Sequence, residues 1–239
     1  MRINATGKYY TDLNHEVKKT QDREVVIDHC LGQRYIGTGV TGKNIIIHGT
    51  PGNALGAYLK GTDLTVFGNV QDAVGDTMDS GKIIVHGSGG DTVGYGMRGG
   101  AIYIKGHAGY RVGIHMKAYQ DHQPVIVVGG STGSFLGEYQ AGGTIIVLGL
   151  DRKKGMPTGS YLGTGMHGGE MYIRSCEMPR ATDQVTVTPC TKEDLAKITD
   201  KLEYFCTNFD VSMEEILSRP FWKLVPSAYN PYNSLYTAY

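Results

Sequence analysis

The sequence is poor in several features that define common classes of protein. It has only four cysteines, at Cys30, Cys176, Cys190 and Cys206, and no two of them share a C-x-x-C spacing. A disulfide framework or a structural zinc site is therefore not indicated. Basic and acidic residues balance at 23 each, which leaves no electrostatic footprint for nucleic acid. No apolar run reaches the ~18 residues of a membrane span, and the N-terminus lacks the apolar stretch of a signal peptide. We expect a cytoplasmic protein that binds neither nucleic acid nor membrane.

Glycine is abundant instead, with 35 residues in 239, about twice the ~7% that is usual. The glycines repeat: from Gly37 the first four steps are 19 residues each, and steps of 24 and 26 follow, which equal 19 plus insertions of five and seven. A fixed period of this size is the signature of a repeat architecture. The seven anchor glycines are Gly37, Gly56, Gly75, Gly94, Gly113, Gly137 and Gly163.

A short strand is predicted in every repeat. The eighth and tenth positions after each anchor are apolar in all seven repeats, from Ile45 and Ile47 to Met171 and Ile173, whereas the ninth and eleventh are mixed. This period of two buries one face of a strand. The residue before each anchor is also apolar, as is the third residue after it except at Gln140, so a continuous core is expected.

From these columns we predict an all-β solenoid, a right-handed parallel β-helix of about seven 19-residue coils. Strands of successive coils would stack at ~4.8 Å, and the glycines would mark corners. Left-handed hexapeptide helices need a period divisible by six, which 19 is not. We expect an N-terminal cap over residues 1–29, the repeat domain over 30–189, and a helical and aromatic C-terminal cap over 190–239.

Both caps carry helix signals. A short helix is predicted from Asn14 as its N-cap. Thr191 with Asp194, and Ser212 with Glu215, have the spacing of capping boxes that start two C-terminal helices. The last stretch, YNPYNSLYTAY, is aromatic and has no period.

The stretch GYGMRGG has the glycine spacing of a dinucleotide-binding loop. Such a loop follows a strand and opens a helix, but here the strand AIYIKG comes next. The glycines are therefore assigned to corners.

Two groups of side chains are candidates for chemical sites. Asp72, Asp76 and Asp79 could form a carbohydrate-cleaving site on a β-helix, or they could be turn residues and caps. His48 and His86 share an outward column two repeats apart, roughly 10 Å by strand spacing, which is too far for one metal ion. We predict no catalytic, cofactor-binding or metal-binding residue.

Several stretches resemble the GXGXG domain family, among them GQRYIGTGV, GTPGNALGAYLKG, GYRVGIHMKAY and GTGMHGGEMYIR. That family includes the C-terminal domain of the glutamate synthase large subunit and the C-type subunit of formylmethanofuran dehydrogenase. The motifs look closer to the stand-alone version of the first, and the C-terminal DLAKITDKLEYFCTNFDVSMEEIL also looks like its tail.

The resemblance implies a non-catalytic scaffold subunit of a glutamate synthase-type complex, which converts glutamine and 2-oxoglutarate to glutamate. Its partners would be a glutaminase-type amidotransferase subunit and a synthase subunit that holds the FMN and iron–sulfur groups, with no cofactor in this chain. Two alternatives stay open: a scaffold subunit of another redox complex, like the C-type subunit of formylmethanofuran dehydrogenase, and a carbohydrate-active β-helix enzyme.

Partner-facing surfaces are expected at the two insertions and at the aromatic tail. The insertion KAYQDHQ contains Asp121 and His122, and DRKKGMP contains Arg152, Lys153 and Lys154. Exposed strand columns could also make the chain a homo-oligomer.

Overall fold

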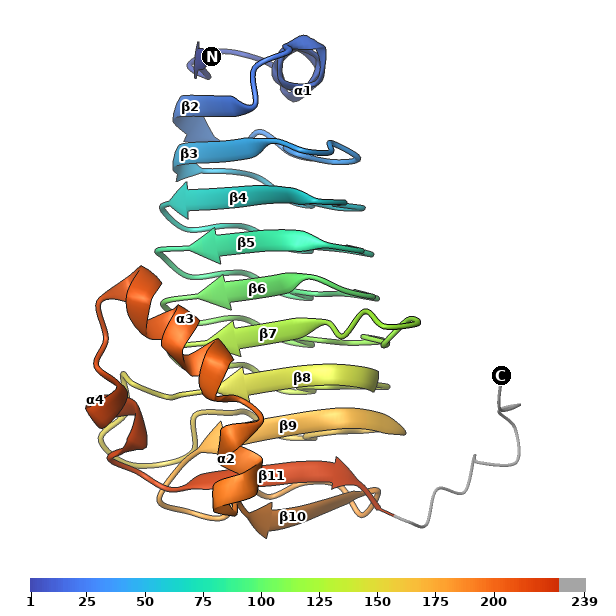
Figure 1. The fold of residues 1–239 in the computed structure, drawn as a ribbon, viewed down its shortest axis with the longest axis vertical. Helices are drawn as coiled ribbons and strands as arrows, with labels where there is room; N and C mark the ends of the chain where they lie inside the picture. The colour runs from blue at the N-terminus through green and yellow to red at the C-terminus, as the bar shows by residue number, and fades with distance from the viewer. Residues whose placement is uncertain (228–239) are drawn as a thin grey trace.

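The computed structural model describes residues 1–227, so the predicted aromatic tail lies outside the described residues. Within them, eleven strands form one sheet that runs the length of the molecule (Figure 1). Their bounds are β1 Arg2–Asn4, β2 Glu24–Leu31, β3 Asn44–Thr50, β4 Thr62–Phe67, β5 Gly81–Val85, β6 Ala101–Ile104, β7 Val125–Val128, β8 Ala141–Val147, β9 Gly168–Arg174, β10 Val185–Pro189 and β11 Phe221–Pro226.

The strands follow chain order except at the C-terminal end, where the order is β9-β11-β10. Every pair from β1 to β9 is parallel, while β11 is antiparallel to both β9 and β10. The register in the middle of the sheet equals the sequence period: Leu64 lies beside Ile83 and Ile83 beside Ile102. Equivalent residues of successive repeats are thus direct neighbours.

The prediction of a right-handed parallel β-helix was wrong. Within residues 1–227 the structure contains a single open sheet with few helices, mostly parallel and ended by an antiparallel pair. Each repeat supplies one strand to it, and the rest of the repeat is turns with isolated bridges such as Thr41 to Lys60. A β-helix would wrap its core in several sheets, and the glycine-rich part of this repeat does not form strands, because its backbone alternates between left-handed and other conformations.

The main core lies between the sheet and these turn segments. The inward strand residues are fully buried together with the apolar residues next to the anchors, such as Val74 and Met78. Successive turns are joined by backbone hydrogen bonds. The amide of Gly75 donates to the carbonyl of Leu55 at 2.9 Å, and that of Gly94 to Val74 at 2.8 Å. This satisfies buried backbone groups without a second sheet.

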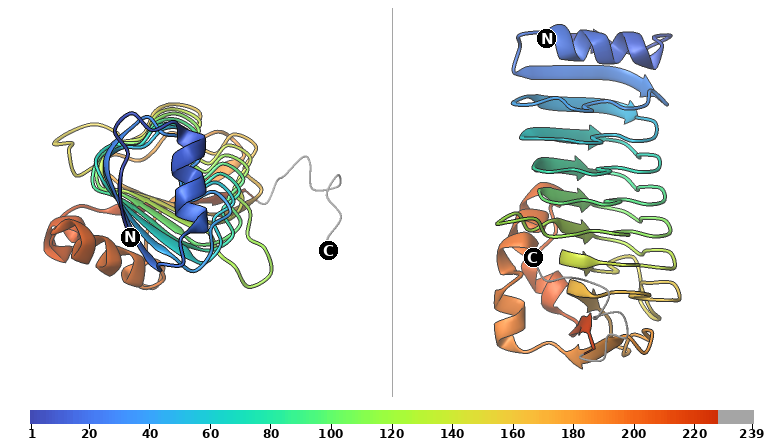
Figure 2. Two further views of the ribbon diagram at one scale, coloured as in Figure 1. Left: turned by 90° about the horizontal axis from the view of Figure 1, so that it is seen from above. Right: turned by 90° about the vertical axis from the view of Figure 1, so that its right-hand side faces the viewer.

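A second core lies on the opposite, outward face of the sheet. Three helices cover β5 to β9 there: α2 Lys192–Ala196, α3 Thr199–Phe209 and α4 Met213–Leu217 (Figures 1 and 2). Phe205 and Tyr172 are fully buried in this layer. The capping box of Thr191 and Asp194 is present at α2, and the Ser212 side chain accepts from the Glu215 amide at α4, so both predicted helix starts are confirmed.

The N-terminal helix α1, Tyr10–Lys19, covers the N-terminal end of the main core (Figure 2), and its Leu13 and Val17 side chains are fully buried. The predicted N-cap at Asn14 was wrong, because the N-cap is Tyr9, five residues earlier. Asn14 lies inside the helix, where its amide donates to the carbonyl of Arg34 at 2.8 Å.

A buried arginine and a half-buried lysine attach the helical layer to the sheet. Arg174 is 4% exposed and donates to the carbonyls of Leu148, Glu215 and Ile216. Lys223 of β11 forms ion pairs with Glu170 at 2.9 Å and with Asp194 at 2.8 Å. Hydrogen bonds from Lys223 and from the Thr191 amide lower the pKa of Asp194 to about 2.

Candidate functional site

The turn around each anchor glycine has the same backbone in all seven repeats. The anchor, the residue two before it and the residue two after it all have positive φ. In the third repeat these are Ala73, Gly75 and Thr77, at φ of 58°, 67° and 52°. A left-handed backbone is rare for residues other than glycine, asparagine and aspartate, so the hydrogen bonds between turns must hold it. The regular geometry places equivalent side chains in rows on the outside of the turns.

Of the three aspartates considered as a hydrolytic site, Asp72 belongs to such a row. Asp72 Oδ1 accepts from the Asp91 amide at 2.9 Å, and Asp91 Oδ1 accepts from the Tyr110 amide at 2.8 Å. Asn53 begins the row by accepting from the Asp72 amide. Each carboxylate thus binds a backbone N–H one repeat further on, which is the role of a turn cap. Asp76 accepts from the Thr77 hydroxyl at 2.8 Å.

A second row has the same function. Asn69 accepts from the Ser88 amide, Ser88 from the His107 amide, and His107 Nδ1 from the Ser131 amide at 3.1 Å. Because Nδ1 of His107 is an acceptor in this bond, it carries no proton there. This histidine is therefore part of the structural row.

His48 and His86 are joined by Phe67 in an aromatic stack on the outward sheet face. Ring centroids are 5.2 Å apart from His48 to Phe67 and 4.5 Å from Phe67 to His86, and Phe209 of α3 meets His86 edge-on. Burial, with a smaller effect of Lys105, lowers the pKa of His86. Within residues 1–227, no group of three or more His, Cys, Asp or Glu side chains could hold a metal ion.

The predicted partner-facing residues lie in two places. Asp121 and His122 are exposed in a tight turn in which Tyr119 and His122 exchange backbone hydrogen bonds. Arg152, Lys153 and Lys154 are exposed in the loop after β8. Arg219, beyond α4, donates to the carbonyls of Arg152 and Lys153. The structure thus brings the second insertion next to the helical layer but does not join it to the first.

Exposed tyrosines gather on the turn segments, a feature that the sequence analysis missed. We call this surface the tyrosine edge. His115 stacks on Tyr139 at 5.1 Å, Phe135 stacks on Tyr161 at 4.9 Å, and Arg111 lies over Phe135. Its tyrosines are between 42% and 60% exposed: Tyr35, Tyr58, Tyr95, Tyr110, Tyr139 and Tyr161.

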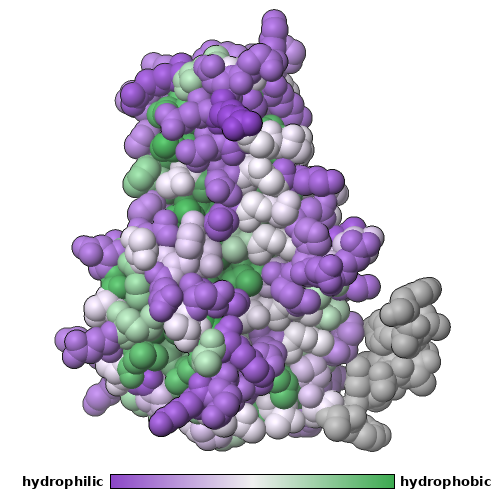
Figure 3. Space-filling model, in the orientation of Figure 1, coloured by the Kyte–Doolittle hydropathy of each residue, from purple (hydrophilic) through white to green (hydrophobic). Residues whose placement is uncertain are grey.

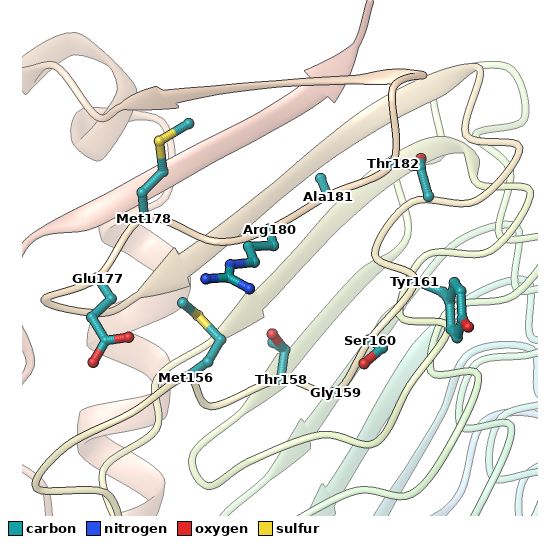
Figure 4. A pocket seen from close by; sticks show the side chains of 10 residues that line it. All are labelled: Met156, Thr158, Gly159, Ser160, Tyr161, Glu177, Met178, Arg180, Ala181 and Thr182. Atoms are coloured by element: carbon teal, nitrogen blue, oxygen red, sulfur yellow. The ribbon is translucent and has the colours of Figure 1, made fainter.

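A pocket of about 520 Å³ opens between residues 156–161 and residues 177–182 (Figure 4). The two segments are joined where the Thr182 amide donates to the Leu162 carbonyl at 3.2 Å. Arg180 points into the pocket between Met156 and Thr158. The pocket was not predicted, because its walls are about 20 residues apart and have no motif.

Comparisons with known proteins agree with the repeat pattern. The model of the GXGXG motif family matches residues 8–227. The chain is 41% identical to the uncharacterized protein MJ1350 of Methanocaldococcus jannaschii, over 98% of this chain and 95% of that protein. It also resembles a chain in the crystal structure of the formyltransferase/hydrolase complex (FhcABCD) from Methylorubrum extorquens in complex with methylofuran. That match has a TM-score of 0.68 and 18% identity, and it covers 95% of this chain and 96% of the other.

The fold and its glycine-rich turns define a repeat protein of the GXGXG class. The chain belongs to the GXGXG motif family, as the resemblance implied. Among residues 1–227, no helix combines the length and the apolar character that a bilayer span requires.

Proposed function

We propose that the chain is a non-catalytic assembly subunit of a multi-subunit enzyme complex, with the formyltransferase/hydrolase complex as its structural counterpart. The observation that carries this proposal is the match along the length of both chains, 95% and 96%, to one member of such a complex. Family membership over residues 8–227 supports it. The alternative of a scaffold outside glutamate synthase thereby becomes our first candidate.

The tyrosine edge offers a surface suited to this role. Tyrosine and arginine are enriched at the centres of protein interfaces, where a rigid ring contributes contact area at a low cost in conformational entropy. Here Tyr139 and Tyr161 are held by stacking on His115 and Phe135 while 43% and 60% of their surfaces stay exposed. The rings are pre-ordered before a partner arrives, which reduces the cost of binding.

The aspartates support an assembly role better than a carbohydrate-active one. A glycosidase needs two carboxylates that face a substrate across a gap. Asp72 and Asp91 each accept a backbone amide from the next repeat instead. The proposed chain holds its partners in place, and the chemistry takes place in them.

A glutamate synthase-type complex is the second candidate, because stretches such as GYRVGIHMKAY and GTGMHGGEMYIR resemble that branch of the family. In that case the partners would be the glutaminase-type subunit and the synthase subunit with FMN and iron–sulfur groups, and this chain would still carry no cofactor. The electron-transfer and ammonia-releasing steps would lie outside it.

Affinity capture of the tagged chain from its native cells, followed by mass spectrometry, tests the proposal. A stoichiometric set of formyltransferase-type or hydrolase-type subunits supports the first candidate. Co-purified glutaminase-type and FMN-containing subunits would replace it with the second. A Tyr139→Ala, Tyr161→Ala variant should lose the partners, while a Tyr9→Ala control, exposed at the N-terminal helix, should keep them. A chain recovered alone under gentle conditions would overturn the assembly role.

A further inference from the structure

The pocket between residues 156–161 and 177–182 contains a cation without a partner. Arg180 is exposed and extends into the pocket (Figure 4). Among residues 1–227 it forms no ion pair, and no hydrogen bond of its guanidinium group is present. Glu177 is the one carboxylate in the lining, and it does not pair with Arg180. The five guanidinium N–H donors are thus available to a ligand.

A hydroxyl beside this cation is also unsatisfied. Among residues 1–227, Oγ1 of Thr158 is buried and has no hydrogen-bond partner, and Thr158 lines the same pocket as Arg180. An unpaired buried hydroxyl destabilises the fold, so a ligand acceptor that reaches it would remove that cost. Arg180 and Thr158 together offer donors to one acceptor group.

Most of the charged side chains around the pocket are positive. Arg152, Lys153 and Lys154 belong to the loop that leads into its wall, and Arg219 donates to that loop at 2.5 Å and 3.2 Å. Asp151, at 3.7 Å from Arg152, offsets one of these charges. The remaining excess of positive charge attracts anions to this end of the molecule. The face drawn in Figure 3 has hydrophilic and hydrophobic patches side by side in its lower part.

Part of the lining is apolar. Met156 and Met178 contribute flexible thioether side chains, and Tyr161 and Ala181 also line the pocket. Methionine adapts its shape to apolar groups of different outline. A volume of about 520 Å³ lies within the usual range of small-molecule sites.

We propose that this pocket binds a carboxylate carried on a short apolar stem. Arg180 takes the carboxylate through paired N–H donors, the geometry that arginine and carboxylate share. Thr158 donates to one of its oxygens, and Met156 and Met178 pack along the stem. A single arginine inside the pocket fits a monoanion better than a phosphate dianion. The carboxylate is that of a free small acid or of an acidic side chain in a bound peptide segment. This inference does not depend on the assembly role proposed above.

Methionine methyl resonances of the full chain provide a direct test, because Met156 and Met178 line the pocket whereas Met78, Met97 and Met116 are buried in the core. The protein, labelled with ¹³C at the methionine methyls, is titrated with sodium hexanoate and, separately, with 1-hexanol. We expect hexanoate to shift the two pocket signals saturably and hexanol to bind at least tenfold more weakly. The core signals should stay in place and report that the fold is intact.

Matched variants assign the effect to the proposed cation. Arg180→Gln should weaken hexanoate binding at least tenfold, whereas Arg98→Gln, an exposed arginine on the fourth repeat, should leave it unchanged. A second arm uses a capped tripeptide with a central glutamate and its glutamine counterpart. Hexanoate binding that depends on Arg180 supports a free acid as ligand. Binding of the glutamate peptide alone, again dependent on Arg180, supports an acidic side chain. Equal shifts with hexanol, equal binding to the Arg180→Gln variant, or no response to any carboxylate would overturn the proposal.

Discussion

Gly75 gives the most direct test of why the anchor column is glycine. Its φ is +67°, and a Cβ placed on it would lie 2.5 Å from Cδ1 of Ile102 on the next repeat. Alanine at this position therefore costs about 1–2 kcal/mol for the left-handed backbone and about 1–3 kcal/mol for overpacking. Gly42 has nearly the same φ, +68°, but nothing lies within 4 Å of its would-be Cβ. We therefore expect Gly42→Ala to lower the free energy of unfolding only by the cost of the left-handed backbone.

The steric part can be recovered by removing the atom that clashes. Ile102→Val deletes Cδ1 and by itself should cost about 0.5–1.5 kcal/mol. In the Gly75→Ala background, Ile102→Val should lower the free energy of unfolding by less, or raise it. The reason is that both substitutions act on the contact between the Cβ at position 75 and Cδ1 of Ile102. Urea unfolding followed by far-ultraviolet circular dichroism gives the free energies, provided the slopes agree. Equal costs for Gly75→Ala and Gly42→Ala, or an Ile102→Val cost that is identical in both backgrounds, would refute this explanation.

Two further predictions concern the cations that attach the helical layer. Arg174→Met should lower the free energy of unfolding by about 3 kcal/mol, because three backbone carbonyls lose a charged donor in the interior. Arg219 is half-buried and its hydrogen bonds are exposed, so Arg219→Met should cost less than about 1 kcal/mol. Similar losses in the two urea titrations would contradict the assignment. For Lys223, the relevant quantity is the pH dependence of the melting temperature. The pKa of Asp194 is about 2 in the folded state against about 3.9 unfolded, so its contribution is complete above pH ~4 and is lost as the pH falls toward 2. Lys223→Met should flatten the decline of the melting temperature in that window, and an unchanged decline would show that Lys223 is not its cause.

Much of the core could be predicted from one sequence because the repeat supplies its own alignment. Columns such as Leu64, Ile83 and Ile102 are apolar in every repeat, and the sheet places them side by side. The same columns led to the wrong fold class. Apolar alternation shows where a strand is, but not how many sheets the remaining residues form, and here the turns pair through single hydrogen bonds. The position of β11 between β9 and β10 was equally inaccessible, because no local pattern specifies pairing with β9 about 50 residues earlier.

The candidate sites, like the fold, could be predicted only in part from the sequence. The Asp72, Asp76 and Asp79 cluster was visible in the sequence, but the structure divides it. Asp72 belongs to a row with Asn53 and Asp91 that binds amides one repeat away, at a spacing of 19 residues, whereas Asp76 accepts from the adjacent Thr77 hydroxyl. Arg180 had no motif to mark it. Its interest arises because no carboxylate among residues 1–227 pairs with it, and only the three-dimensional arrangement shows this.

The outward sheet face contains a signal that the sequence analysis did not use. The ninth position after the anchor is half-buried in the first two repeats, at Ile46 and Thr65, and buried from the third repeat onward. The buried members are Ile84, Tyr103, Val127, Ile146 and Tyr172. A strand that is apolar on both faces must be covered on both. The helical segment that follows the repeats has an apolar stripe that includes Leu202, Phe205 and Phe209. These residues are not part of the main core and pack in the second one. The five strands have an apolar face that needs a cover, and the helices have an apolar stripe that needs a surface to pack on. The two are therefore expected to pack against each other. The covering of β5–β9 by α2–α4 could thus have been predicted from the outward column together with the helical stripe.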